Sequence, residues 1–296
     1  MKLRAFAVLS AAAVFFLAAI PASASSEGHS YLALGDSVPF GFHPDPATWP
    51  TANTFIGYPE IVAQRLNVED VNASCPGQTS DGFSSLSGSD NGCFGFRSAF
   101  PLHVSYTGTQ LAFATSYLVA HPRTRLVTMM LGANDFFLLQ HECTATNTTA
   151  GGIAACIGAG LPATLSFIEA HLSGIFAALR ATGYNGLIIG VTYYALSYSD
   201  PLSLLVSESL ANVMIAAAST YGVKIASGFD AFQAASAAFG GDTCAAGLRL
   251  PAFEATGCDV HPSATGHEVL AAAVIKAIAA TCPAANAVGC LNRNQS

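Results

Sequence analysis

The sequence predicts a three-layer α/β/α sandwich with a mainly parallel central sheet. Short apolar runs alternate along the chain with longer stretches of helical periodicity, and this alternation is typical of βαβ units. The residues best suited to chemistry follow the ends of the apolar runs, where an open parallel sheet binds its ligands. Since no repeat and no long linker interrupt the pattern, residues 25–296 are expected to form one domain.

The first 24 residues have the pattern of a secretory signal. Lys2 and Arg4 precede an apolar run at residues 5–20, and small residues follow at 21–24. The run is shorter than the roughly 20 residues that a membrane helix needs, which favours a cleaved signal over an uncleaved anchor. The mature chain is therefore expected to begin at Ser25 and to be secreted, into the extracellular space or the periplasm.

The remaining elements follow from local patterns. Apolar runs predict strands at residues 31–34, 71–73, 125–131, 187–191 and 223–226. Amphipathic stretches predict helices at 59–66, 110–120, 161–181, 202–221 and 265–280. Pro59 suits a first helical turn, Pro122 and Pro283 follow helix ends, and Gly183 caps a third helix. Long loops are expected at residues 81–100, 141–160 and 240–257.

The composition excludes one class of partner. The chain is 52% hydrophobic and 10% charged, with a net charge of −7 and no run of Lys or Arg. A nucleic-acid partner requires a basic surface, so none is expected. The negative balance fits a soluble protein that acts on neutral molecules. A monomer without stable membrane insertion is expected.

Eight cysteines in an exported chain predict disulfides. Although eight cysteines allow about 105 complete pairings, here they fall into four successive local pairs. The pairs are Cys75–Cys93, Cys143–Cys156, Cys244–Cys258 and Cys282–Cys290. No C-x-x-C and no H-E-x-x-H occurs, so the spacing of a zinc site is lacking.

Four short motifs carry groups suited to acyl transfer. Ser37 follows the first strand in Gly-Asp-Ser and suits a nucleophile, and Gly77 lies in a turn where its N–H can approach a ligand. Asn134 follows the 125–131 strand and suits an oxyanion donor. His261 precedes the last helix, in an expected loop, and suits a general base. Each motif alone also fits a structural role: a capping or turn residue for the first three, and a structural hydrogen bond for His261.

Together, in this order, the four motifs resemble the SGNH (GDSL-type) hydrolase family, in its secreted bacterial esterase and lipase branch. The resemblance extends over segments such as 31–41, 57–66 and 101–135. It implies a flavodoxin-like fold and ester hydrolysis without a metal or organic cofactor. It also implies Ser37 as nucleophile and His261 as base, with an oxyanion hole from the N–H groups of Ser37 and Gly77 and the Asn134 side chain.

The third catalytic residue departs from the family pattern. The family places its acid three residues before the histidine, but Cys258 stands there and Asp259 lies two before His261. Either the Asp259 carboxylate or the Cys258 carbonyl can orient the imidazole. We favour Asp259 as the catalytic acid, because a carboxylate also stabilises the imidazolium.

The predicted function is hydrolysis of a small-molecule or lipid carboxylic ester through an acyl-enzyme on Ser37. Two enzymatic alternatives use the same site: a carbohydrate acetyl esterase and an acyltransferase. A non-enzymatic alternative is an inactive secreted binding module, since fold alone does not give function. The presence of all four motif residues argues against that module.

Overall fold

The computed structural model describes residues 29–281, so the expected signal segment and the Cys282–Cys290 pair lie outside the described residues. Its centre is a parallel sheet in the order β2-β1-β3-β4-β5. The strands are β1 Ser30–Gly35, β2 Glu69–Asn72, β3 Thr124–Met130, β4 Leu187–Val191 and β5 Lys224–Ala226. Every residue of β1, β3 and β4 is buried, as both faces of a parallel sheet are covered.

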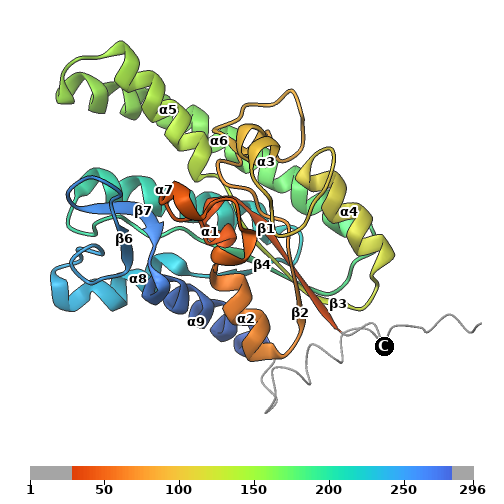
Figure 1. Cartoon of the computed structure of the whole chain (residues 1–296). Helices are drawn as coiled ribbons and strands as arrows, with labels where there is room; N and C mark the ends of the chain where they lie inside the picture. Colours follow the sequence, from red (N-terminus) through yellow and green to blue (C-terminus); the bar gives the residue numbers. More distant parts are fainter. Residues whose placement is uncertain (1–28, 282–296) are drawn as a thin grey trace, which may run out of the picture.

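Helices cover the sheet and confirm the predicted three-layer sandwich (Figure 1). They are α1 Ser37–Phe40, α2 Tyr58–Leu66, α3 Cys93–Ala99, α4 Gln110–Ala120, α5 Ala133–Thr146, α6 Ala150–Ala181, α7 Pro201–Ser219, α8 Gly228–Ser236 and α9 Ala264–Thr281. Three short 3-10 turns are η1 Pro46–Thr48, η2 Ala52–Thr54 and η3 Ala237–Phe239. Helices α2 and α8 pack on α9, and α6 packs on α4 and α7. The five predicted helices and five predicted strands are thus all present.

The order of the strands reverses between β1 and β3. The chain passes from β1 outward to β2, then crosses to β3 on the other side of β1. In an open α/β sheet, such a switch point opens a crevice at the carboxyl ends of the two strands. The segments after β1 and β3 therefore lie at the place where this topology puts a site.

The expected long loop at residues 141–160 is wrong, because the segment is almost entirely helical. Helix α5 continues to Thr146 and α6 begins at Ala150, with a short turn between them. The Thr149 side chain caps α6 by accepting a hydrogen bond from the Gly152 N–H. The two helices form a hairpin that extends from the body of the molecule (Figure 1).

One glycine in the expected loop serves helix packing in this hairpin. A Cβ placed on Gly160 of α6 would lie 2.5 Å from Leu139 Cδ1 of α5, so glycine lets the helices approach closely. The Cys143–Cys156 disulfide joins the same two helices. Contact between helices has therefore outweighed the low helix propensity of glycine.

The chain that carries His261 is also more regular than expected. Strands β6 Arg249–Pro251 and β7 Cys258–Pro262 form an antiparallel hairpin separate from the main sheet. His261 lies in β7, so its predicted place in a loop is wrong. The Cys244–Cys258 disulfide ties the hairpin to the preceding segment, and Cys75–Cys93 is formed as well. Three of the four predicted pairings are thus confirmed.

Two of the described helices, α6 and α7, are long and apolar enough to cross a membrane, judged by length and composition alone. They pack against each other in one helical layer of the sandwich. In the described chain, 44% of the most apolar stretch of α7 is buried but only 17% of that of α6.

Candidate active site

The turn after β1 is shaped by a glycine and capped by an aspartate. Gly35 has φ +132°, and a Cβ there would lie 2.0 Å from the carbonyl oxygen of Met130. The buried Asp36 is the N-cap of α1, and its Oδ1 accepts a hydrogen bond from the Val38 N–H at 3.0 Å. Ser37 is the first residue of α1 and is partly exposed. The predicted nucleophile therefore lies at the carboxyl end of β1, and the capping role belongs to Asp36.

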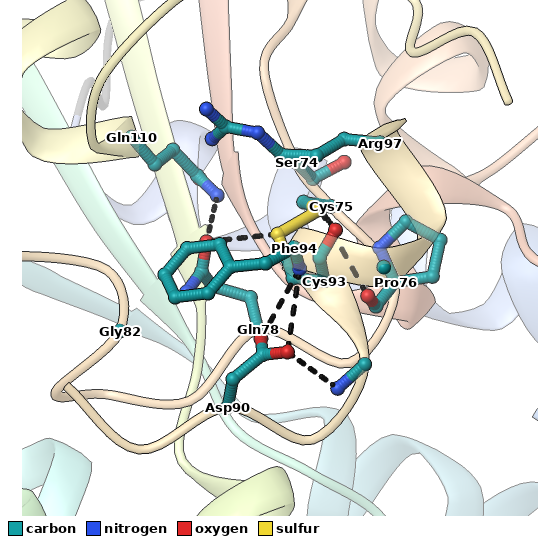
Figure 2. The surroundings of a disulfide bond; sticks show 12 residues. Ser74, Cys75, Pro76, Gln78, Gly82, Asp90, Cys93, Phe94, Arg97 and Gln110 are labelled. Atoms are coloured by element: carbon teal, nitrogen blue, oxygen red, sulfur yellow. Dashed lines mark hydrogen bonds between the residues drawn. A yellow bond between two sulfur atoms is a disulfide. The ribbon is translucent and has the colours of Figure 1, made fainter. Parts of the chain in front are cut away.

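A buried glutamine from α4 fixes this turn from behind. Gln110 Oε1 accepts from the Gly35 N–H at 2.7 Å, and Gln110 Nε2 donates to the Gly35 carbonyl at 3.0 Å. The same Nε2 also lies 3.4 Å from Gln78 Oε1. Figure 2 shows this pair of amides beside the Cys75–Cys93 disulfide. The nucleophile turn and the turn at residues 75–78 are thereby held together.

Gly77 lies in the turn at 75–78 with φ +81°. A Cβ at this position would lie 2.4 Å from the Asn91 carbonyl oxygen, and the Gly77 carbonyl accepts from the Asn91 N–H at 3.2 Å. Gly77 is not among the residues that line the cavity described below, whereas Ser37 is. Through its neighbour Gln78 it lies close to Asn134.

Asn134 connects the nucleophile turn to the 75–78 turn. It is the second residue of α5 and only 5% exposed. Its Nδ2 donates to the Gln78 carbonyl at 3.0 Å and to Asp36 Oδ2 at 3.2 Å, while its Oδ1 accepts from Asn91 Nδ2 at 2.8 Å. The ends of β1 and β3 are thus joined through one amide group.

The acid and the imidazole are paired within β7. Asp259 Oδ1 accepts from the His261 N–H at 2.9 Å and is hydrogen-bonded to His261 Nδ1. Although partial burial alone would raise the pKa of Asp259, these bonds from His261 hold it below its usual value. The Phe42 ring packs against the imidazole, with ring centroids 4.9 Å apart. Of the two acceptors considered for His261, the structure places the carboxylate at Nδ1.

One cavity of about 240 Å³ brings Ser37, Asn134 and His261 together. Its further wall is mainly apolar and comes largely from α5, α7 and the segments beside them. The apolar lining residues are Val38, Ala133, Phe136, Phe137, Leu196, Leu202, Val206, Leu210 and Val260. Asp259 is not among the lining residues. Ser37, Asn134 and His261 thus border a space suited to an apolar group.

The sequence reasoning missed two tyrosines that line the same cavity. Tyr193 donates a hydrogen bond to Asp36 Oδ2, and Tyr194 donates to the Val260 carbonyl at 2.7 Å. Both follow the apolar run at 187–191, so the signal that found Ser37 and Asn134 was available for them as well. Burial raises the pKa of Asp36 to about 6, although the Tyr193 and Val38 hydrogen bonds lower it.

Comparison with known families finds a match to the GDSL-like Lipase/Acylhydrolase family over residues 33–269. Phospholipase A1 from Streptomyces albidoflavus NA297 has a similar structure, with TM-score 0.55, 16% identity and coverage of 84% of this chain and 99% of that one. LAE5, an alpha/beta hydrolase enzyme from the metagenome of Lake Arreo, Spain, is similar too, with TM-score 0.52, 17% identity and coverage of 89% of this chain and 96% of that one. A mutant acetyl-xylooligosaccharide esterase from Geobacillus is also similar, with TM-score 0.51, 18% identity and coverage of 85% of this chain and 94% of that one. No curated protein sequence matches. At these identities the structures show likeness of fold.

Proposed function

The chain belongs to the GDSL-like lipase/acylhydrolase family and is thus a carboxylic ester hydrolase, and we propose that it cleaves its ester through an acyl-enzyme on Ser37. The predicted resemblance to SGNH hydrolases is confirmed by this membership. The observation that carries the proposal is the meeting of Ser37, Asn134 and His261 in one cavity. In this proposal His261 is the general base and Asp259 orients it.

The proposed reaction has two halves. His261 Nε2 takes the Ser37 hydroxyl proton as Oγ bonds to the ester carbonyl carbon, and the resulting imidazolium then protonates the leaving alcohol oxygen as the C–O bond breaks. Water attacks the acyl-enzyme while His261 accepts its proton, and the acid departs as Ser37 regains a proton. The bond between Asp259 and His261 Nδ1 supports this, since it leaves Nε2 as the nitrogen for serine.

The proposed oxyanion hole consists of the Ser37 and Gly77 N–H groups and the Asn134 amide. Both hydrogens of Asn134 Nδ2 have acceptors in the ligand-free protein, namely Gln78 and Asp36. The bond to Asp36 is the longer, at 3.2 Å. We infer that a small rotation of the Asn134 side chain brings this hydrogen toward the oxyanion when charge develops there, with the shorter Gln78 bond retained.

The lining of the cavity supports an ester with an apolar acyl group as the substrate. The walls beyond the reactive side chains are mostly aliphatic and aromatic. The cavity of about 240 Å³ lies below the usual range of about 300–1,000 Å³ for ligand pockets, which favours a short or medium chain. An acetylated glycan would leave most of this apolar surface unused, so we place carbohydrate esterase activity second.

The proposal includes export of one catalytic domain, residues 25–296, after removal of residues 1–24. Three disulfides in the described part of the chain support an oxidising destination. Such bonds are rare in the reducing cytosol.

The test is a series of p-nitrophenyl esters of increasing acyl length, assayed beside acetylated xylan. Wild type should prefer an intermediate chain, and Ser37→Ala should lose about a thousandfold or more in kcat. Ser219→Ala, at the distant end of α7, is the matched control. Activity of Ser37→Ala within tenfold of wild type would remove Ser37 from the mechanism. Faster release of acetate from xylan than of any aryl ester would favour the carbohydrate esterase.

A further inference from the structure

Two neighbouring tyrosines after β4 reach to opposite halves of the active site. We propose that Tyr193 and Tyr194 are positioning residues, with the Tyr193 hydroxyl holding Asp36 beside the nucleophile and the Tyr194 hydroxyl holding the strand that bears His261. The inference rests on the proposed roles of Ser37 and His261. In this proposal, the two tyrosines at the end of β4 set the distance between the Ser37 and His261 side chains.

The Tyr193 half acts through Asp36. The Tyr193 hydroxyl donates to Asp36 Oδ2, the oxygen that also accepts from Asn134 Nδ2. Tyr193 is 8% exposed and Asp36 is 1% exposed, so bulk water has little access to replace a lost hydroxyl. Removing that hydroxyl leaves a buried carboxylate with one acceptor site less satisfied. The residue before Ser37 and the amide of Asn134 would then both be less firmly placed.

The Tyr194 half acts on the backbone between the acid and the base. The Tyr194 hydroxyl donates at 2.7 Å to the carbonyl of Val260, which stands between Asp259 and His261. Its ring stacks on Phe232 of α8, with centroids 4.1 Å apart and planes 14° apart. The ring is thereby fixed, and its hydroxyl lies at a set distance from the sheet.

This link matters for the site because β7 is not a member of the main sheet. In the described chain its strand partner is β6, so the register of the central sheet does not set the distance from His261 to Ser37. Arg249 of β6 donates to the Asp259 carbonyl at 3.2 Å, but that bond stays within the hairpin. The Tyr194 hydroxyl instead joins the hairpin to the segment that follows β4, a strand hydrogen-bonded to β3.

The pKa of Asp36 offers a second way to distinguish the role of Tyr193 from that of Tyr194. The titratable groups that act on Asp36 or on which it acts are Tyr58, Asp135, Tyr193, Tyr194 and His261. Among them the Tyr193 hydroxyl is the side chain that donates to its carboxylate and so lowers its pKa. Loss of that hydroxyl raises the pKa of Asp36 further, whereas loss of the Tyr194 hydroxyl leaves the carboxylate bonded.

The experiment compares Tyr193→Phe, Tyr194→Phe and Tyr184→Phe. Tyr184 is a buried tyrosine whose hydroxyl donates to the Leu187 carbonyl at the start of β4, far along the strand from the site, so it is the matched control. Both site variants should lose about 10- to 100-fold in kcat with KM changed less than about threefold, since misplacement by about 1 Å can cost that much. The acid limb of the pH profile of kcat should shift to higher pH in Tyr193→Phe and in neither of the other two variants. Tyr184→Phe should keep wild-type kinetics at a comparable melting temperature.

The rate at which a fluorophosphonate labels Ser37 is a second measurement. Only folded molecules are labelled, so this rate can be compared even where a variant folds poorly. Tyr194→Phe should slow this labelling, because the reaction needs His261. If wild type hydrolyses esters while both site variants keep kcat within twofold, the positioning role is wrong and the proposed function stands. If wild type hydrolyses no ester, the function itself fails. An equal loss in Tyr184→Phe would show a general structural effect and overturn the assignment.

Discussion

Asp259 and His261 lie two residues apart on one face of β7, with the carboxylate hydrogen-bonded to the imidazole Nδ1. Side chains of a strand alternate between its faces, so a two-residue spacing points both in the same direction. In a loop the same spacing would guarantee no such alignment. The strand therefore explains how an acid at this unusual distance from the histidine reaches it.

Asp259→Asn should lower kcat by about 10²–10⁴, because an amide favours the wrong imidazole tautomer and leaves the imidazolium unstabilised. The measurement is kcat on a p-nitrophenyl ester at the pH optimum. Asp230→Asn, at an exposed position in the first turn of α8, should leave kcat unchanged. A loss of tenfold or less at Asp259 would assign the orienting role to the backbone.

Asn134→Ala should lower kcat by about 10²–10³, the usual cost of one oxyanion donor. KM should change much less, since the amide is expected to act on the transition state. Asn185→Ala, at an exposed position shortly before β4, is the control. If KM rises while kcat is kept, Asn134 binds the ground-state ester instead.

Gly77→Ala should destabilise the protein by about 1–3 kcal/mol, because φ is +81° and a Cβ would meet the Asn91 carbonyl at 2.4 Å. Urea unfolding measures the change. Gly95→Ala, inside α3 with open space around its Cβ position, should instead stabilise by about 0.5–1 kcal/mol. Equal stability of the two variants would show that the 75–78 turn tolerates a side chain.

Replacing both Cys143 and Cys156 by Ser should lower the free energy of unfolding by about 3 kcal/mol, because the disulfide no longer restricts the unfolded chain by closing a short loop. Since α5 also supplies Phe136 and Phe137 to the cavity, selectivity among acyl lengths should fall while kcat on acetate esters is kept. Melting temperature and the ester series test this. An unchanged chain-length profile would show that the α5 wall does not depend on the disulfide.

In His267→Leu, the free energy of unfolding should decrease less between neutral and acidic pH than it does in wild type. Burial lowers the pKa of His267 to about 3, and its Nδ1 has no hydrogen-bond partner in the described chain. Below its ordinary pKa of 6.5 the unfolded chain binds a proton that the folded chain does not, so stability is lost as pH falls. Melting temperatures at pH 7 and pH 4.5 should differ less in the variant than in wild type. An undiminished difference would place the acid sensitivity elsewhere.

The sequence predicted the buried strands and the residues at their ends, because both depend on local pattern. The runs at 31–34 and 125–131 are apolar enough to be recognised, and parallel pairing then places Ser37 and Asn134 at one edge. The helical hairpin of α5 and α6 escaped prediction, since the fit of Gly160 against Leu139 depends on a contact between two helices.

The supporting residues of the site were harder to predict for a similar reason. Gln110 holds Gly35 from 75 residues away in sequence, and Tyr193 meets Asp36 from 157 residues away. No local spacing marks such partners, because they become neighbours only when the sheet has formed. The pairing of Asp259 with His261 was ambiguous until the strand β7 resolved it.

Asp259 and His261 share one short hairpin that the Cys244–Cys258 bridge ties to the preceding segment, whereas Ser37 begins α1 just after the buried strand β1. We therefore expect reducing agents to act unequally on the proposed catalytic residues, because Cys244 and Cys258 are partly exposed whereas Cys75 and Cys93 are buried. Thiol exchange at Cys244–Cys258 should loosen Asp259 and His261 first and leave Ser37 in its turn. Enzyme produced in a reducing cytoplasm is then expected to fold its core and yet be slow, and to gain speed on later oxidation without refolding.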